Sequence, residues 1–275
     1  MSQLTFYKYQ ATGNDFVMID DRPERFDTNE LSLVKALCDR RFGIGADGLI
    51  LIRNFADCDF EMVYFNADGS QSLCGNGSRC AVEFARHLGI LKHTQAIHFM
   101  AIDGLHQANI YPNNTIGIAM HDVTTVDHYG DDLFINTGSP HYIRFIASHQ
   151  SANVLEDGRA IRYSEPFGQP GTNVNFIEVM DNEAIFVRTY ERGVEAETLS
   201  CGTGVTAASL AATTRGLNSP VQVHTLGGQL SVKFRQATDH HFKDIELIGP
   251  AKLVYQGSID TRQLTDNIAD RGVLV

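Results

Sequence analysis

One four-residue pattern, Cys-Gly-x-Gly, occurs twice in the chain, and this repetition constrains the fold more than any other feature. It stands at residues 74–77 and again at residues 201–204. Three pairs of identical residues continue the match without a gap: Ala81 with Ala208, Ala85 with Ala212, and Gly89 with Gly216. We interpret the match as the duplication of one structural unit. The alternative is that glycines recur by chance where helices begin.

Each copy of the pattern predicts the start of a buried helix. The glycines at 89 and 216 are typical of the residue that follows a helix C-terminus, and residues 205–214 are small or apolar nearly all round, as in a buried helix. Short apolar or alternating runs elsewhere predict strands, and a shorter helix is expected from about Thr28. We predict a mixed α+β fold of two pseudo-symmetric lobes, each a curved, barrel-like mixed β-sheet wrapped around a central α-helix.

The boundary between the lobes is expected where the sequence turns polar, within residues 119–132. The N-terminal lobe would then be residues 1–122 and carry the first repeated cysteine, and the C-terminal lobe residues 123–258 and carry the second. Residues 259–275 carry several charges and little pattern. We expect this tail to lie over the surface or to pack on the N-terminal lobe.

Charge and cysteine content limit the partners and the compartment. The net charge of this 275-residue chain is −11, with acidic residues spread along it, so association with nucleic acid or an anionic membrane would be unfavourable. The first residues lack a basic and then apolar signal pattern. Five cysteines in a chain of this length favour a reducing cytoplasm over a disulfide scaffold. We therefore expect a cytoplasmic protein with reactive thiols.

A cysteine at a helix start is suited to acid and base chemistry. The backbone N–H groups of the first turn and the positive end of the helix dipole both favour the thiolate. The neighbouring glycines let the backbone approach a ligand, and the same N–H groups can bind a carboxylate. Two such turns facing each other could remove a proton from one face of a carbon and donate one to the opposite face. That reaction is a racemisation or an epimerisation.

Removing the α-proton of an amino acid requires strong stabilisation of the resulting charge. Preorganised N–H donors at two helix starts, in a site closed to water, can supply it. The sequence has no pyridoxal lysine motif, Rossmann glycine pattern or P-loop, and its histidines lack metal-ligand spacing. We therefore expect no cofactor and no metal.

The other three cysteines, Cys38, Cys58 and Cys80, are interpreted as small buried hydrophobes. A thiol redox pair is the alternative interpretation of Cys74 and Cys201, although Cys-x-x-Cys spacing is missing. A disulfide between these two would be the working state of a redox protein, whereas it would inactivate an epimerase.

Further blocks accompany the cysteine turns. They are Gly-Asn-Asp-Phe at residues 13–16, Phe-Asn-Ala-Asp-Gly-Ser at residues 65–70 and Tyr-Glu-Arg-Gly at residues 190–193. With the cysteine blocks at 74–80 and 201–204, the sequence resembles the diaminopimelate epimerase family, in order and over nearly the whole chain. The second cysteine block alone is also similar to that of proline and hydroxyproline racemases.

The resemblance implies a cofactor-independent isomerase that interconverts LL- and meso-diaminopimelate in lysine and peptidoglycan biosynthesis, as a cytoplasmic homodimer. It implies that Cys74 and Cys201 exchange the roles of acid and base. The residues that it implies for binding the substrate are Asn14, Asn66, Gly75, Asn76, Ser139, Asn173, Glu191, Arg192, Gly202 and Thr203. His141 and Glu191 are implied to tune the two thiols.

Several of these assignments have alternatives. Asparagines commonly form turns, which could be the whole role of Asn66, and Arg192 could be a surface residue, although a guanidinium suits a second carboxylate. Two positions depart from many family members: Ser139 stands where an asparagine is common, and Gly48 where some have a substrate-contacting glutamine. Rival functions are an epimerase for another amino acid, such as histidine or hydroxyproline, and an isomerase or binding protein of this fold without two-base chemistry.

Overall fold

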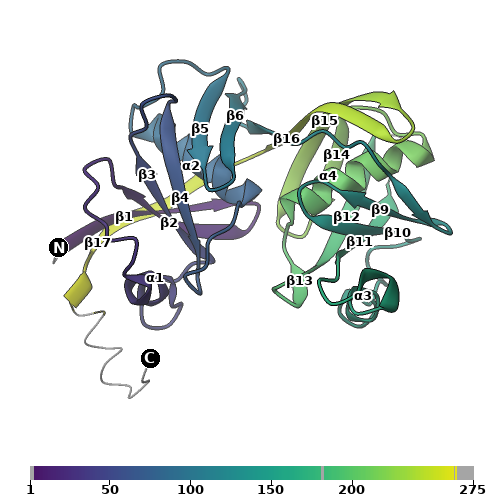
Figure 1. The fold of residues 1–275 in the computed structure, drawn as a ribbon, viewed down its shortest axis with the longest axis horizontal. Coiled ribbons are helices and arrows are strands. Elements are labelled where there is room, and N and C mark those ends of the chain that lie inside the picture. The colour runs from purple at the N-terminus through teal and green to yellow at the C-terminus, as the bar shows by residue number, and fades with distance from the viewer. Residues whose placement is uncertain (1–2, 181–182, 263, 265–275) are drawn as a thin grey trace. The chain divides into compact units, whose positions relative to one another are not determined.

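A computed structural model of the chain describes residues 3–180, 183–262 and 264. The chain divides into two units. Unit 1 comprises Met1–Ile116 and Ala251–Val275, and unit 2 comprises Gly117–Pro250. Over the described residues, each combines a mixed sheet with α-helices (Figure 1).

Unit 1 consists of strands that follow one another along the first part of the chain, together with one strand from near the C-terminal end of the chain. Its elements are β1 (Gln3–Ala11), β2 (Asn14–Asp20), α1 (Leu31–Cys38), β3 (Gly48–Arg53), β4 (Phe60–Asn66), α2 (Gly75–His87), β5 (Ile97–Ala101), β6 (Gly104–Ile110) and β17 (Lys252–Asp260). The pairings β1/β2, β3/β4 and β5/β6 are antiparallel, and β2/β3 and β4/β5 are parallel. β17 pairs antiparallel with β1.

Unit 2 repeats this order. Its elements are β7 (Ile116–Ala119), which begins at the boundary, β8 (Asp127–Tyr129), β9 (Asp132–Asn136), β10 (Pro140–Phe145), α3 (Val154–Arg162), the 3-10 turn η1 (Glu165–Phe167), β11 (Asn173–Val179), β12 (Ala184–Glu191), β13 (Ala196–Thr198), α4 (Gly202–Ala211), the 3-10 turn η2 (Ala212–Arg215), β14 (Val221–Thr225), β15 (Gly228–Thr238) and β16 (His241–Gly249). The pairings β9/β10, β11/β12 and β14/β15 are antiparallel, and β10/β11 and β12/β14 are parallel.

The two units share one connectivity, because both alternate antiparallel and parallel pairs in the same order. A parallel pair needs a crossover connection, and each crossover contains a helix: α1 and α2 in unit 1, α3 and α4 in unit 2. The helices that follow the two Cys-Gly-x-Gly turns, α2 and α4, occupy the equivalent second crossover. The predicted α+β fold of two similar lobes is confirmed, and the shared connectivity supports duplication.

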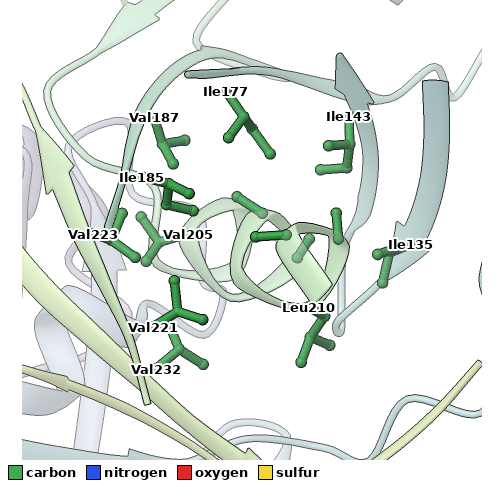
Figure 2. Close-up of a cluster of buried hydrophobic side chains, with 14 of the residues drawn as sticks. Ile135, Ile143, Ile177, Ile185, Val187, Val205, Leu210, Val221, Val223 and Val232 are labelled. Atoms are coloured by element: carbon green, nitrogen blue, oxygen red, sulfur yellow. The ribbon is translucent and has the colours of Figure 1, made fainter. Parts of the chain in front are cut away.

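In each unit the second helix is the centre around which the sheet curves. α2 packs against β1, β2, β3, β4 and β17, and α4 against seven strands of its own unit. Figure 2 shows side chains from the surrounding strands, such as Ile143, Ile185 and Val223, directed at α4 from several sides. Ala207, Ala208 and the other small residues of α4 are buried all round its axis, which explains why its sequence has no polar face.

The first helix starts later than predicted. α1 begins at Leu31, because the Asp27 carboxylate accepts a hydrogen bond from the backbone N of Asn29 (2.9 Å) and so closes a separate turn before the helix. Glu30, not Asp27 or Thr28, is the residue before the first helical turn.

The unit boundaries differ from the expected lobes 1–122 and 123–258. The second unit takes Gly117 to Pro250, and the strand β17, expected in the second lobe, belongs to unit 1 because it pairs with β1. The predicted tail begins inside β17, where Ile259 pairs with Leu4, and Leu264 is buried in the core of unit 1. Residues 263 and 265–275 of that tail lie outside the described residues. Over the described ranges, no helix is long and apolar enough to cross a membrane.

Candidate active site

Cys74 lies at the N-cap of α2, immediately before its first turn. Its backbone is extended (φ −132°, ψ 112°), and its sulfur accepts a hydrogen bond from the backbone N–H of Gly77 at 3.4 Å. Such an N–H belongs to the donors that a helix start leaves without intrahelical acceptors. A Cβ added at Gly77 would lie 3.1 Å from Ile50 Cδ1 and 3.5 Å from Phe16 Cε1. The second glycine of the pattern therefore lets the turn sit tightly against an apolar wall.

Asn14 connects β2 to this turn. Its Oδ1 lies 3.5 Å from the Cys74 Sγ, which donates to it, and 3.3 Å from the Asn76 Nδ2. Its own Nδ2 donates to the Asp47 carboxylate at 2.6 Å. A carboxylate only accepts hydrogen bonds, so Asp47 fixes which way the Asn14 amide faces. The amide oxygen is thereby turned toward the thiol.

A charged network supports Asp47 and Asn14. The Asp15 carboxylate binds the Lys8 ammonium at 2.6 Å and the Arg40 guanidinium at 2.6 Å, and Arg40 also bridges to Asp47 at 2.7 Å. Burial alone would raise the pKa of Asp15, but hydrogen bonds from Arg40 and Lys8 outweigh it and hold that pKa well below its usual range. Asp15 is therefore ionised at neutral pH. Through Arg40, the network holds Asp47 in place beside Asn14.

The side chain of Asn76 is held in place by the buried guanidinium of Arg79. Its Oδ1 accepts from the Arg79 guanidinium at 2.7 Å, and the same guanidinium nitrogen donates to the Thr12 hydroxyl at 3.2 Å. Arg79 is fully buried. Gly75 and Asn76 are the first two residues of α2, so their backbone N–H groups stand where a carboxylate binds at a helix start.

Asn66 lies at the end of β4, and its amide is engaged by its own surroundings. Nδ2 contacts the Ser70 hydroxyl at 3.0 Å and the Ser72 hydroxyl at 3.2 Å, and Oδ1 accepts from the Tyr64 hydroxyl at 2.8 Å. A Cβ at Gly48 would collide with the Tyr64 ring and lie 2.5 Å from the Phe65 carbonyl oxygen. Tyr64 thus fills the space that a side chain at position 48 would need. These contacts account for the turn, which was the alternative role of Asn66.

Cys201 occupies the matching N-cap position of α4 in unit 2. Its backbone is again extended (φ −110°, ψ 112°), and the residue is buried. The Thr203 hydroxyl lies 3.5 Å from its sulfur, and the Thr203 backbone carbonyl accepts from the Thr137 hydroxyl at 2.9 Å. Gly202 and Thr203 are the first residues of α4, as Gly75 and Asn76 are of α2.

His141 lies behind Thr203 and is fully buried in β10. Its Nε2 is 2.9 Å from the Thr203 hydroxyl, and its Nδ1 is 3.1 Å from the Asn175 Nδ2. Burial, aided by the positive charge of Arg192, lowers the pKa of His141 to about 3. The imidazole is therefore neutral at physiological pH.

The remaining predicted residues of unit 2 meet at the ends of β10, β11 and β12. The Asn173 Nδ2 donates to the Ser139 hydroxyl at 2.9 Å, and its Oδ1 accepts from the backbone N of Arg192 at 2.9 Å. Ser139 therefore still makes a hydrogen bond despite its short side chain. Glu191 ends β12, and the Arg192 guanidinium reaches the Pro170 carbonyl oxygen at 3.4 Å.

The other cysteines are held as thiols by their environments. Burial raises the pKa of Cys38 to about 12 and raises those of Cys80 and Cys58 above their usual range. Cys38 and Cys80 are buried as expected, whereas Cys58 is only half-buried and its sulfur donates to the Phe60 carbonyl oxygen at 3.1 Å. All five cysteines lie in the described ranges, and none forms a disulfide. Within those ranges, no group of three or more His, Cys, Asp and Glu side chains has the arrangement of a metal site.

Three supporting residues were not predicted. Asp47 fixes Asn14, Arg79 holds Asn76, and Asn175 contacts His141. A sequence signal existed for Asn175: it lies two residues after Asn173 in an otherwise apolar run, so both point to one face of a strand. Asp47 lies 33 residues after Asn14, a separation at which pattern alone indicates no partner, whereas Arg79 follows Asn76 by three residues on α2, a spacing at which helical side chains meet.

Comparison with known proteins identifies the family. The family model for diaminopimelate epimerase matches residues 6–126 and 133–254. A protein named diaminopimelate epimerase from Flavobacterium psychrophilum is 47% identical over 93% of this chain and 100% of its own length. One of the same name from Aquifex aeolicus is 39% identical over 95% of this chain and 99% of its own.

Solved structures of more distant proteins share the fold. A phenazine biosynthesis protein of the PhzF family from Bacillus anthracis matches with a TM-score of 0.73 at 14% identity, over 94% of this chain and 99% of its own. A hydroxyproline epimerase from Agrobacterium vitis matches with a TM-score of 0.61 at 13% identity, over 94% of each chain. The resemblance seen in the sequence blocks is confirmed: this chain belongs to the diaminopimelate epimerase family.

Proposed function

We propose that this protein is an isomerase that epimerises LL-2,6-diaminopimelate to meso-diaminopimelate by a two-cysteine mechanism without a cofactor, in lysine and peptidoglycan biosynthesis. One observation carries the proposal. In a chain of the diaminopimelate epimerase family, Cys74 and Cys201 occupy the same N-cap position of equivalent helices in two duplicated units.

In the proposed reaction the thiolate of one cysteine removes the α-proton from one face of the carbon. The thiol of the other cysteine donates its proton to the opposite face, so the two sulfurs exchange protonation states in each turnover. The negative charge that develops on the substrate carboxylate is stabilised by backbone N–H groups at the two helix starts, from Gly75, Asn76, Gly202 and Thr203. The reverse reaction uses the same two groups in exchanged roles.

The choice of diaminopimelate is supported by polar groups suited to a second amino-acid head. Arg192 is a guanidinium that can bind a carboxylate through two parallel hydrogen bonds, and its backbone is fixed by Asn173. Asn14 is the corresponding polar group beside Cys74. We assign Ser139, Asn66 and Glu191 to the surroundings of the bound substrate, and His141 and Glu191 to tuning of the thiols.

The further proposals concern the assembly and compartment. We propose a homodimer that includes β17, because Leu253, Val254 and Tyr255 are 41%, 56% and 46% exposed on consecutive positions of that strand and such apolar runs favour association. We propose a cytoplasmic location, which five cysteines outside any disulfide support.

The test is turnover of LL-diaminopimelate by purified, reduced protein and by Cys74→Ala and Cys201→Ala variants. We expect each variant to lose conversion to the meso isomer by at least about a thousandfold while keeping the circular dichroism spectrum of the wild type, since each removes an obligatory proton carrier. Cys58→Ala is the matched control and should retain activity. Conversion by either variant at the wild-type rate would overturn the two-base proposal, and inactivity of the wild type on this substrate alone would point to another amino acid.

A further inference from the structure

The side-chain amide of Asn175 has only one orientation that its surroundings accept. Asn175 is fully buried in β11. Its Nδ2 donates to the backbone carbonyl oxygen of Tyr142 at 3.2 Å, and its Oδ1 accepts from the Thr189 hydroxyl at 2.9 Å. Reversing the amide would set its oxygen against the Tyr142 carbonyl oxygen, where neither atom can donate. The NH2 group therefore faces both Tyr142 and His141.

This orientation determines which nitrogen of His141 carries the proton. The Asn175 Nδ2 lies 3.1 Å from the His141 Nδ1, and because Nδ2 is a donor, Nδ1 must accept and carries no hydrogen. The ring is neutral, because its burial lowers the pKa of His141 to about 3. Its single proton is then on Nε2, which donates to the Thr203 hydroxyl oxygen at 2.9 Å.

The Thr203 hydroxyl lies between the His141 ring and the Cys201 sulfur. Since its oxygen accepts from His141, its own hydrogen is directed elsewhere, and the Cys201 Sγ lies 3.5 Å away. A hydroxyl that donates to sulfur stabilises the thiolate more than the thiol, because hydrogen bonds to ionised acceptors are the stronger ones. The positive charge of Arg192, which helps to lower the pKa of His141, also favours a negative charge in this region.

The second glycine of the repeated pattern makes room for this chain of contacts. A Cβ at Gly204 would collide with the Asn175 Oδ1 and lie 3.3 Å from the His141 Cε1. At the equivalent Gly77 the neighbours are Ile50 and Phe16 instead. At the first turn the sulfur faces an acceptor, the Asn14 Oδ1. The duplication is therefore broken at the side chains that contact the two thiols.

We infer that Asn175 is a positioning residue that fixes the Nε2–H tautomer of His141 and, through the Thr203 hydroxyl, makes Cys201 a thiolate before substrate binds. Only the consequence of this inference rests on the proposed function. That consequence is that Cys201 is the first base for the substrate isomer whose α-hydrogen faces Cys201.

The decisive pair of variants is Thr203→Val and Thr203→Ser. Both are close in size to threonine, but only serine keeps the hydroxyl. The readout is the rate at which iodoacetamide alkylates Cys201 at pH 7 in the substrate-free full chain, resolved by peptide mass spectrometry, with Cys74 measured in the same sample. We expect Thr203→Val to slow the alkylation of Cys201 by about tenfold or more. In Thr203→Ser, Cys201 should be alkylated near the wild-type rate. The alkylation rate of Cys74 should be the same in both variants as in the wild type.

Asn175→Leu tests the origin of the chain of contacts. We expect it to slow alkylation of Cys201 in the same direction and to remove the Nε2–H signature of His141 in ¹⁵N NMR of the histidine rings, assigned with a His141→Gln variant. Wild-type alkylation of Cys201 in Thr203→Val, or a His141 ring protonated on Nδ1 in the wild type, would overturn the inference. Neither readout needs turnover. If the proposed substrate is wrong, both readouts still give the expected result. If the chain of contacts from Asn175 to Cys201 is wrong, the protein can still epimerise diaminopimelate.

Discussion

At the scale of single residues, the place of the two repeated cysteines at helix starts could be predicted, because the same glycine-flanked pattern occurs twice. The repeated glycine-flanked turn singles out Cys74 and Cys201 from five cysteines. The side chains that orient Asn14 and His141 could not be predicted in the same way. Asp47 orients Asn14 and Asn175 orients His141 through side-chain amides, and these contacts depend on tertiary geometry that leaves no periodic signal.

Thiol reactivity should follow these environments. Burial raises the pKa of Cys38 to about 12 and raises that of Cys80 above its usual range, so neither forms thiolate near neutral pH. We expect iodoacetamide at about pH 7.5 to modify Cys74 and Cys201 before Cys38 and Cys80 in the native protein, as measured by peptide mass spectrometry. Modification of Cys38 or Cys80 first would contradict this order.

His141 should make stability depend on pH. Its folded pKa of about 3 lies below the ordinary value of 6.5, so between these values the unfolded chain binds the extra proton. The stabilising effect of the neutral ring is complete above about pH 6.5 and is lost as the pH falls toward 3. We expect the free energy of unfolding by urea to fall more steeply from about pH 6.5 to about pH 4 in the wild type than in His141→Gln. If the free energy of unfolding fell with the same slope in both proteins, His141 would protonate as easily in the folded protein as in the unfolded chain.

At the scale of elements, the sequence predicts the central helices α2 and α4 well and the start of α1 poorly. α4 could be predicted because small and apolar residues surround its axis, which only a buried helix tolerates. The start of α1 could not, because Asp27, a good N-cap type, closes a turn with Asn29 instead. Local hydrogen bonds of this kind compete with capping, and the residue type alone does not decide between them.

The core around α4 gives a matched test of packing. Leu210 is fully buried and lies among the side chains shown in Figure 2, so Leu210→Ala should lower the free energy of unfolding by about 2–5 kcal/mol. Leu226, in the turn between β14 and β15, is exposed, and Leu226→Ala should change it by less than about 0.5 kcal/mol. Urea unfolding of both variants measures the difference, and equal losses would contradict the central position of α4.

At the scale of the whole molecule, the repeat predicts two similar units but not which strands close them. β17 follows unit 2 in sequence and pairs with β1 in unit 1. An alternating pattern indicates a strand but not the strand with which it pairs. The boundary expected at 258 lies inside β17, and the two units divide between Pro250 and Ala251. The matching order of antiparallel and parallel pairs in the two units accounts for the success of the fold prediction.

The proposed homodimer can be tested on β17. Val254 is 56% exposed, and Val254→Arg should convert a dimer to monomers, because a charge introduced into an apolar interface is costly to desolvate. Lys233→Arg, on an exposed position of β15, is the control. Sedimentation equilibrium measures the mass, and an unchanged dimer in Val254→Arg would place the interface elsewhere.

The most direct test of the central claim is epimerisation of LL-diaminopimelate in D2O, followed to a few per cent conversion. Two bases on opposite faces predict that the first meso product carries deuterium at the inverted carbon while the remaining LL substrate keeps its proton. Product that retains the substrate proton would indicate a single base acting on both faces, and would contradict the assignment of Cys74 and Cys201 as a pair of opposed bases.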